Sequence, residues 1–257
     1  MRQRFETPLK ALLLIGMGLF LYSRLANGSL YFYINQRFMV FTLLTVVGLV
    51  IVGLSYRFKR KADEEAHEHA EHDSSHAGHA HSHGLTWGGV ALVLLPIVLG
   101  LAVPPQPLGA SALTNREINA GLNDTSMPGI VGATANLPTT EKNILDWWRT
   151  FRSSQAVNED ERIIGQEARV LGFVYHDERY GEGHFMLVRY TVSCCVADAS
   201  ALALVVASPE AATLESDQWV EVSGVFSPGD LPNWKMPVLV ARSITSVDVP
   251  DQPYLYP

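Results

Sequence analysis

Two adjacent cysteines, the only two in this 257-residue chain, are the residues most able to do chemistry. Cys194 and Cys195 lie in the run SCCVAD, which ends at Asp198. Thiolate and carboxylate ligands bind metal ions, and a thiol pair can also be redox-active. We expect the pair to lie on a strand, where alternation points one sulfur inward and the other toward Asp198 and water. The alternatives are core packing alone and a metal or redox site that also uses His184.

Histidine dominates a second segment. Seven of the nine histidines fall between positions 67 and 83, and six acidic residues lie among and before them. Neutral imidazole binds zinc, copper and nickel, so this loop can capture or sense a divalent metal. The alternative is a solvated linker that binds such ions weakly, because its composition offers no apolar core. The candidate ligands are His67, His69, His72, His76, His79, His81 and His83.

Catalytic and nucleic-acid-binding patterns are missing from the sequence. It contains no G-x-S-x-G elbow, no phosphate-binding glycine loop and no H-E-x-x-H element. Residues 104–257 carry ten basic and nineteen acidic residues, which argues against a nucleic-acid partner. We therefore expect a protein that is not an enzyme and does not bind nucleic acid.

The segments that must position the cysteines have the composition of strands. Runs rich in Val, Phe and Tyr predict strands at 168–175, 184–196, 202–207, 219–226 and 238–247. Five such strands indicate an OB-like barrel, with a β-sandwich as the alternative. A helix over 141–153, capped by Thr140, should pack on the sheet through the apolar stripe of Ile144, Trp147, Trp148 and Phe151.

Three apolar stretches, 8–26, 38–56 and 85–103, precede this β-rich domain. About 20 such residues cross ~30 Å of hydrocarbon as a helix, so we expect a membrane protein with three N-terminal transmembrane helices. The first is expected to be retained, because no clean signal-peptide cleavage site follows it. The domains are then a membrane domain at 1–103 with a His-rich cytoplasmic loop at 62–84, a linker at 104–140 and a β-rich domain at 141–257.

The basic residues orient these helices. Residues 1–61 carry nine Lys and Arg, clustered before the first stretch and after the second, and none follows the third until Arg116. Excess Lys and Arg mark the cytoplasmic side. The N-terminus and the histidine loop are therefore expected inside, and the β-rich domain is expected to be extracytoplasmic.

Several runs resemble one known family. The segment FVYHDERYGEGHFMLVRYTVSCCVADASALALVV, the following WVEVSGVF, the ending PDQPYLY and the early run YFYINQRFMVFTLL are similar to the YcgQ-like family. The resemblance implies a bacterial plasma-membrane subunit of a two-component permease, whose partner is a larger polytopic permease. It implies no catalytic residues.

Two classes of function fit these observations. The first is an accessory subunit of a two-component membrane permease, with the pore in the polytopic partner. Its basis is that the second and third stretches contain no charged residue, although such residues normally mark a conducted ion's path. The alternative is a membrane-tethered extracytoplasmic metal-binding or thiol-redox protein that acts without a permease. A structural scaffold whose barrel binds another protein is a third reading.

The charge pattern predicts the sidedness of the C-terminus. A cysteine-free epitope placed after Pro257 should be accessible to a membrane-impermeant reagent in cells whose inner membrane is intact. The same epitope placed before Met1 should become accessible only after that membrane is permeabilised. The opposite pattern would overturn the assigned orientation.

Overall fold

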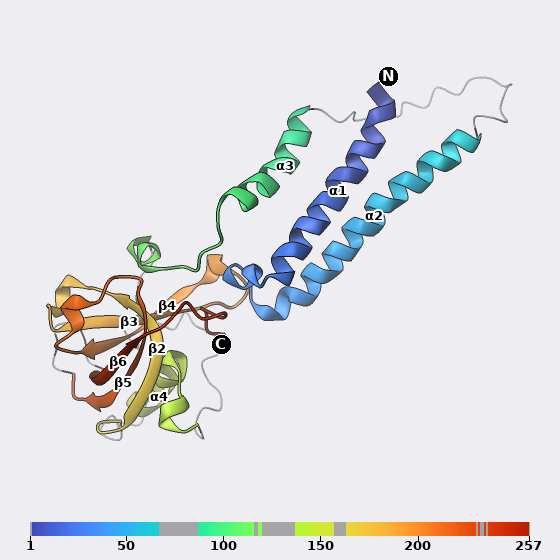
Figure 1. Cartoon of the computed structure of the whole chain (residues 1–257). Helices are drawn as coiled ribbons and strands as arrows, with labels where there is room; N and C mark the ends of the chain where they lie inside the picture. The colour runs from blue at the N-terminus through green and yellow to red at the C-terminus, as the bar shows by residue number, and fades with distance from the viewer. Residues whose placement is uncertain are drawn as a thin grey trace. The chain divides into compact units, whose positions relative to one another are not determined.

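The computed structural model describes residues 2–66, 87–115, 118–119, 137–156, 163–229, 231, 234 and 236–256. It divides into two compact units (Figure 1), of which the first holds 1–30 and 36–106 and the second holds 31–35 and 107–257. The short segment Tyr31–Asn35 therefore belongs to the unit that contains the β-rich domain, although it lies between the first two apolar helices in the chain.

Three helices form the first unit: α1 (Arg2–Ala26), α2 (Met39–Ala66) and α3 (Trp87–Ala102). Two apolar segments, Pro8–Ala26 and Gln36–Tyr56, are long enough to cross a membrane. The described part of α3 has 16 residues, or about 24 Å at 1.5 Å per residue. Crossing by this third helix stays a prediction.

Glycines let α2 and α3 lie close to α1. A Cβ on Gly53 of α2 would lie 2.8 Å from Cγ1 of Ile15, and one on Gly18 of α1 would lie 3.4 Å from Val50. Early residues of α1 thus meet late residues of α2, so the two helices are antiparallel. Helix α3 packs with Gly100 against the ring of Phe20.

The side chain of Arg24 completes the contact between α1 and α3. Its guanidinium donates to the carbonyl oxygen of Gly100. That carbonyl cannot receive the usual helical bond from four residues on, because residue 104 is proline and has no N–H. Since Arg24 and Gly100 both lie near the C-terminal ends of their helices, α1 and α3 run parallel.

A closed five-stranded barrel forms the second unit. Its strands are β2 (Glu167–Tyr175), β3 (His184–Thr191), β4 (Ser200–Ala207), β5 (Trp219–Ser227) and β6 (Val238–Ser246). Neighbours pair in the ring β2–β3–β4–β6–β5–β2, antiparallel except for the parallel β4–β6 pair. The OB-like barrel is confirmed, and the alternative of a β-sandwich is wrong. A two-residue strand, β1 (Ile118–Asn119), pairs in parallel with β4.

Helix α4 (Ile144–Ala156) packs on this barrel through the predicted stripe. Trp147 and Phe151 are fully buried, and their rings lie 4.6 Å and 5.5 Å from the ring of Phe226 on β5. The helix begins later than expected. Thr139–Glu141 forms a separate 3-10 turn, and Asn143 takes the capping position by exchanging hydrogen bonds with Asp146.

A bulge between Ser223 and Gly224 bends β5 against β6. A Cβ at position 224 would overlap the carbonyl oxygen of Val240, so only glycine fits there. At Gly183, by contrast, an added Cβ would have no described atom within 4 Å.

We predict that Gly224→Ala destabilises the barrel by about 1–3 kcal/mol, because the overlapped carbonyl belongs to the backbone and has to move. Thermal unfolding of the detergent-purified chain can be followed by tryptophan fluorescence, since four of the five tryptophans lie in the second unit. Gly183→Ala is the matched control and should melt like the parent. Equal melting of both variants would contradict this account of the bulge.

Candidate functional site

The two cysteines lie in a turn after β3 rather than on the strand. Strand β3 ends at Thr191, so the predicted strand at 184–196 is five residues too long. The chain then turns into a short 3-10 helix, Val196–Asp198. The alternation argument that placed one sulfur in the core is therefore wrong, since Cys194 is exposed and Cys195 is half-buried.

Asp198 builds this turn. Its carboxylate accepts hydrogen bonds from the backbone N–H groups of Ser193, Cys194 and Cys195, at 2.8, 2.7 and 3.1 Å. The Cys195 sulfur in turn accepts from the N–H of residue 198, which completes a reciprocal cap at the start of the helix. Three donors converge on one carboxylate, so the backbone of the cysteine pair is held in a single conformation.

A segment 160 residues earlier in the chain pairs with the same turn. The N–H of Asn35 donates to the carbonyl of Cys194 at 3.0 Å, and the N–H of Val196 donates to Tyr33 at 2.9 Å. Ile34 and Cys195 form the antiparallel bridge between them. The buried Asn35 side chain donates to the carbonyl of Ser193 at 2.9 Å. The cysteine turn is thus paired with the connector between α1 and α2.

The C-terminal tail supports the end of β3 beside the turn. Leu255 donates to Tyr190 at 2.9 Å and accepts from Val192 at 3.0 Å. Arg189 is buried and donates to the carbonyl oxygens of Gln252 and Pro253, at 2.5 and 3.1 Å. Burial lowers the pKa of its guanidinium to about 10. The ending PDQPYLY therefore serves to hold the strand that leads into the cysteines.

The two thiols lie side by side at the surface. The sulfur atoms are 3.7 Å apart, and both cysteines are free. Hydrogen bonds to Asp198 and to Cys195 raise the pKa of the Cys194 thiol to about 11. Partial burial alone would raise the pKa of Asp198, but the bonds from the Cys194 thiol and the three backbone N–H groups lower it overall. The turn therefore combines a protonated thiol with an ionised carboxylate at neutral pH.

One ligand atom from each of Cys194, Cys195 and Asp198 lies within 4.8 Å of the others. The structure thus brings the predicted motif together, and among the described residues this is the single group with such spacing. His184 does not join it, because it begins β3 while the cysteines follow the strand's other end. The seven loop histidines, His67 to His83, lie outside the described residues.

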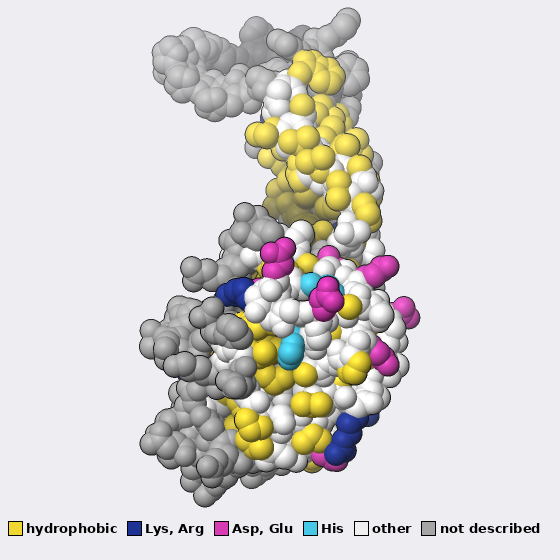
Figure 2. Space-filling view, turned by 90° about the vertical axis from the view of Figure 1, so that its left-hand side faces the viewer, with side chains coloured by type: hydrophobic (Ala, Val, Ile, Leu, Met, Phe, Trp, Pro, Cys, Tyr) yellow, Lys and Arg dark blue, Asp and Glu magenta, His cyan; other side chains and the backbone are white. Residues whose placement is uncertain are grey.

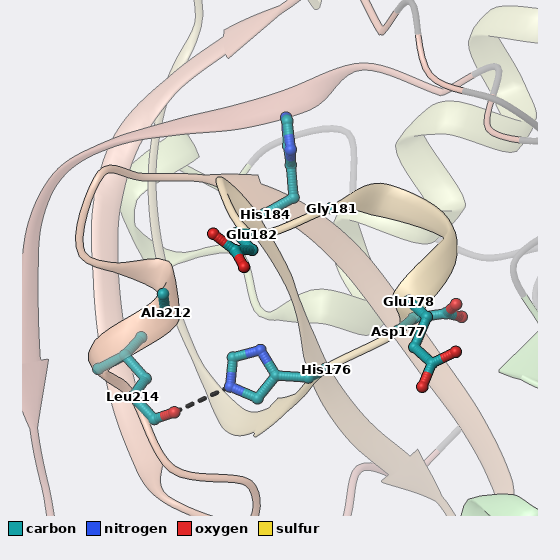
Figure 3. Close-up of a pocket in the computed structure, with 8 residues that line it drawn as sticks. All are labelled: His176, Asp177, Glu178, Gly181, Glu182, His184, Ala212 and Leu214. Atoms are coloured by element: carbon teal, nitrogen blue, oxygen red, sulfur yellow. Dashed lines mark hydrogen bonds between the residues drawn. The ribbon is translucent and has the colours of Figure 1, made fainter.

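An open cavity of about 440 Å³ lies at the other end of β3 (Figure 3). His176 donates through Nε2 to the carbonyl of Leu214 at 2.8 Å. In Figure 3 the ring of His184 points away from the ring of His176, and the carboxylate of Asp177 points away from both. Asp177 pairs with Arg179 at 2.9 Å, and that bond lowers the pKa of its carboxyl. These polar groups do not converge on one point, so the cavity is a weaker candidate than the cysteine turn.

The 33–35 segment is the part of the site that sequence reasoning missed. The run that contains it entered the sequence analysis only through its family resemblance. The available signal was Asn35, a polar residue directly after the aromatic and apolar residues 31–34, which the structure buries.

Comparison with known proteins gives two family matches. The model of the DUF1980 N-terminal domain matches residues 9–119, and that of the DUF1980 C-terminal domain matches residues 131–257. A curated relative, the UPF0703 protein YcgQ of Bacillus subtilis (strain 168), is 22% identical over 96 residues, which are 37% of this chain. The matched region spans 34% of that relative's length.

The hydrogen bonds of Asp198 predict the reactivity of Cys194. In a Cys195→Ser background, Asp198→Asn should lower the pKa of the Cys194 thiol, because it removes the carboxylate that accepts the thiol's hydrogen bond. The thiolate fraction at pH 8 rises about tenfold for each unit by which the pKa falls, while nucleophilicity declines, so alkylation should accelerate at least about threefold. The measurement is the alkylation rate as a function of pH. Asp248→Asn, which alters an exposed acid elsewhere in the unit, should leave the rate unchanged. An unchanged rate in Asp198→Asn would show that Asp198 does not keep this thiol protonated.

Proposed function

The chain belongs to the YcgQ-like family, carrying both DUF1980 domains, and on this premise we propose that it is an accessory subunit of a two-component membrane permease. Its helices sit in the bacterial plasma membrane, its barrel is extracytoplasmic, and a polytopic partner forms the pore. The observation that carries the proposal is the apolar surface of the helical unit.

Exposed apolar side chains lie on all three helices of this unit. Leu12 on α1 and Leu92 and Leu101 on α3 are 68%, 71% and 68% exposed, and apolar side chains cover the helical unit in Figure 2. A contiguous apolar surface of this kind is stable only when lipid or another protein covers it. The charged and histidine side chains in Figure 2 lie instead on the barrel unit.

The pairing of residues 33–35 with the cysteine turn supports three crossings. Both segments belong to one compact unit, so they lie on the same side of the membrane. If α2 crosses the membrane away from that side after residue 38, the chain has to cross back before residue 107. Helix α3 is the apolar helix between these two points that can make the return crossing. The parallel arrangement of α1 and α3, joined by Arg24 and Gly100, agrees with this path. The basic residues at 2–10 and 57–61 then place the shared side outside.

The composition of the helices supports a pore in the partner. Residues 39–56 of α2 and the described part of α3 contain no Asp, Glu, Lys or Arg, whereas intramembrane charges normally line transport pathways. Secondary transporters also build their sites from repeated bundles with broken helices. Three helices with uncharged interiors fit an accessory role better.

Open glycines offer places for partner helices. An added Cβ at Gly16, Gly48 or Gly88 meets no described atom within 4 Å, while Gly18, Gly53 and Gly100 are filled by contacts within the unit. Small residues allow close approach of helices in membranes, so the first three are the candidate contacts with the permease.

We expect the chain to co-purify in mild detergent with a polytopic permease when the two are expressed together. Gly16→Leu and Gly88→Leu should reduce that co-purification without lowering the chain's own level, because a Cβ at either position has no described atom within 4 Å. Leu92→Phe, an exchange of one exposed apolar side chain for another, is the control. Purification of the chain without the permease, in wild type and variants alike, would contradict the accessory role.

A further inference from the structure

We propose that Cys194, Cys195 and Asp198 form a binding site for one tetrahedrally coordinated thiophilic cation of the Zn²⁺ type on the barrel unit. This site does not depend on the permease partnership, and it goes beyond that role. It rests on the positions of the ligand atoms, on the rigidity of the turn and on the one coordination position that the three ligands leave open.

The sulfur positions fit one metal ion. Two thiolates bound to a tetrahedral zinc at 2.3 Å each are separated by roughly 3.8 Å, and the two sulfurs here are 3.7 Å apart. A carboxylate oxygen of Asp198 lies within 4.8 Å of both sulfurs. All three ligand atoms are therefore close enough to reach a single ion through small side-chain adjustments.

The turn is organised before any ion binds. Adjacent residues on a strand would point their side chains to opposite faces, but the three N–H bonds to Asp198 turn both sulfurs to the same side. The bridge between Ile34 and Cys195 and the side chain of Asn35 hold this conformation from the other side of the turn. A site that is already ordered binds with a smaller loss of conformational entropy.

Asp198 supplies charge and position together. Its Oδ2 accepts two backbone bonds, its Oδ1 accepts one, and the carboxylate also accepts from the Cys194 thiol. Loss of the thiol proton on metal binding frees that acceptor position for the ion. Two thiolates and one carboxylate satisfy three of the four positions of a tetrahedral ion. The fourth position remains for water or an exchangeable ligand. The site would therefore hold an ion that is accessible at the surface, unlike a closed structural zinc centre.

Soft ligands define which cations compete for the site. Thiolates favour zinc and cuprous ions over magnesium and calcium, which prefer oxygen ligands. Binding requires both thiols to lose their protons, so it should release protons and weaken as pH falls. The sulfur atoms must also be reduced, because a bond between them would remove both ligands.

The test uses the full chain in detergent, reduced with a phosphine and stripped with a chelator. The seven histidines from His67 to His83 are replaced by Ser in every sample, so that they cannot bind the probe. The probe is Co²⁺, whose thiolate complexes have a characteristic near-ultraviolet absorption, followed by displacement with Zn²⁺. We expect one ion per chain with the thiolate band, displaced by Zn²⁺ but not by Mg²⁺.

Matched variants separate the ligands from the scaffold. Cys194→Ser and Cys195→Ser should each abolish the two-thiolate spectrum, and Asp198→Asn should weaken affinity about 10- to 100-fold. Gly183→Ala, remote from the turn, should bind like the parent. Absence of the thiolate band in the reduced parent would overturn the proposal. So would a band that survives the double replacement of both cysteines, or a native mass lower by two hydrogens that phosphine cannot restore.

Discussion

The antiparallel pairing of Tyr33–Asn35 with Cys194–Val196 is the interaction on which the rest of this structure depends. It satisfies backbone groups on both segments at once, and the Asn35 amide adds a bond to Ser193. Because buried backbone donors and acceptors are costly to leave unpaired, neither segment can adopt another path without loss. One consequence is the fixed conformation of the cysteine turn. Another is that the α1–α2 connector belongs to the same compact unit as the barrel.

The C-terminal tail adds a second constraint at the same place. Arg189 is buried, and its charge is stabilised by two carbonyl oxygens of the tail and by the Trp219 ring at 5.8 Å. The hydroxyl of Tyr254 accepts from the N–H of Leu108 at 2.8 Å and donates to the carbonyl of Phe32 at 3.2 Å. The tail thus joins the segment that follows α3, the connector that follows α1 and the strand that leads into the cysteines. Loss of one partner would leave a buried cation uncompensated, which is the costly form of disruption.

These two constraints join the proposed cation site to the connector between α1 and α2. A ligand that changes the cysteine turn acts directly on residues 33–35, which are followed at once by the 3-10 turn Gln36–Phe38 and α2. The histidine-rich segment at 67–83 is a separate predicted metal-binding segment and lies outside the described residues.

The sequence by itself determined the elements whose signals are local. Apolar runs defined the helices, Val- and Tyr-rich runs defined the five strands to within a residue or two at most ends, and the Trp147–Phe151 stripe defined the buried face of α4. It failed at the end of β3, because no Gly or Pro marks the stop. There the strand is ended by Asp198, whose carboxylate captures three N–H groups, and by a pairing partner 160 residues away. Likewise, the parallel β4–β6 pair that closes the barrel leaves no local trace. Which residues face each other at long range depends on the paths of both chains, so only the tertiary structure decided that the two sulfurs point the same way.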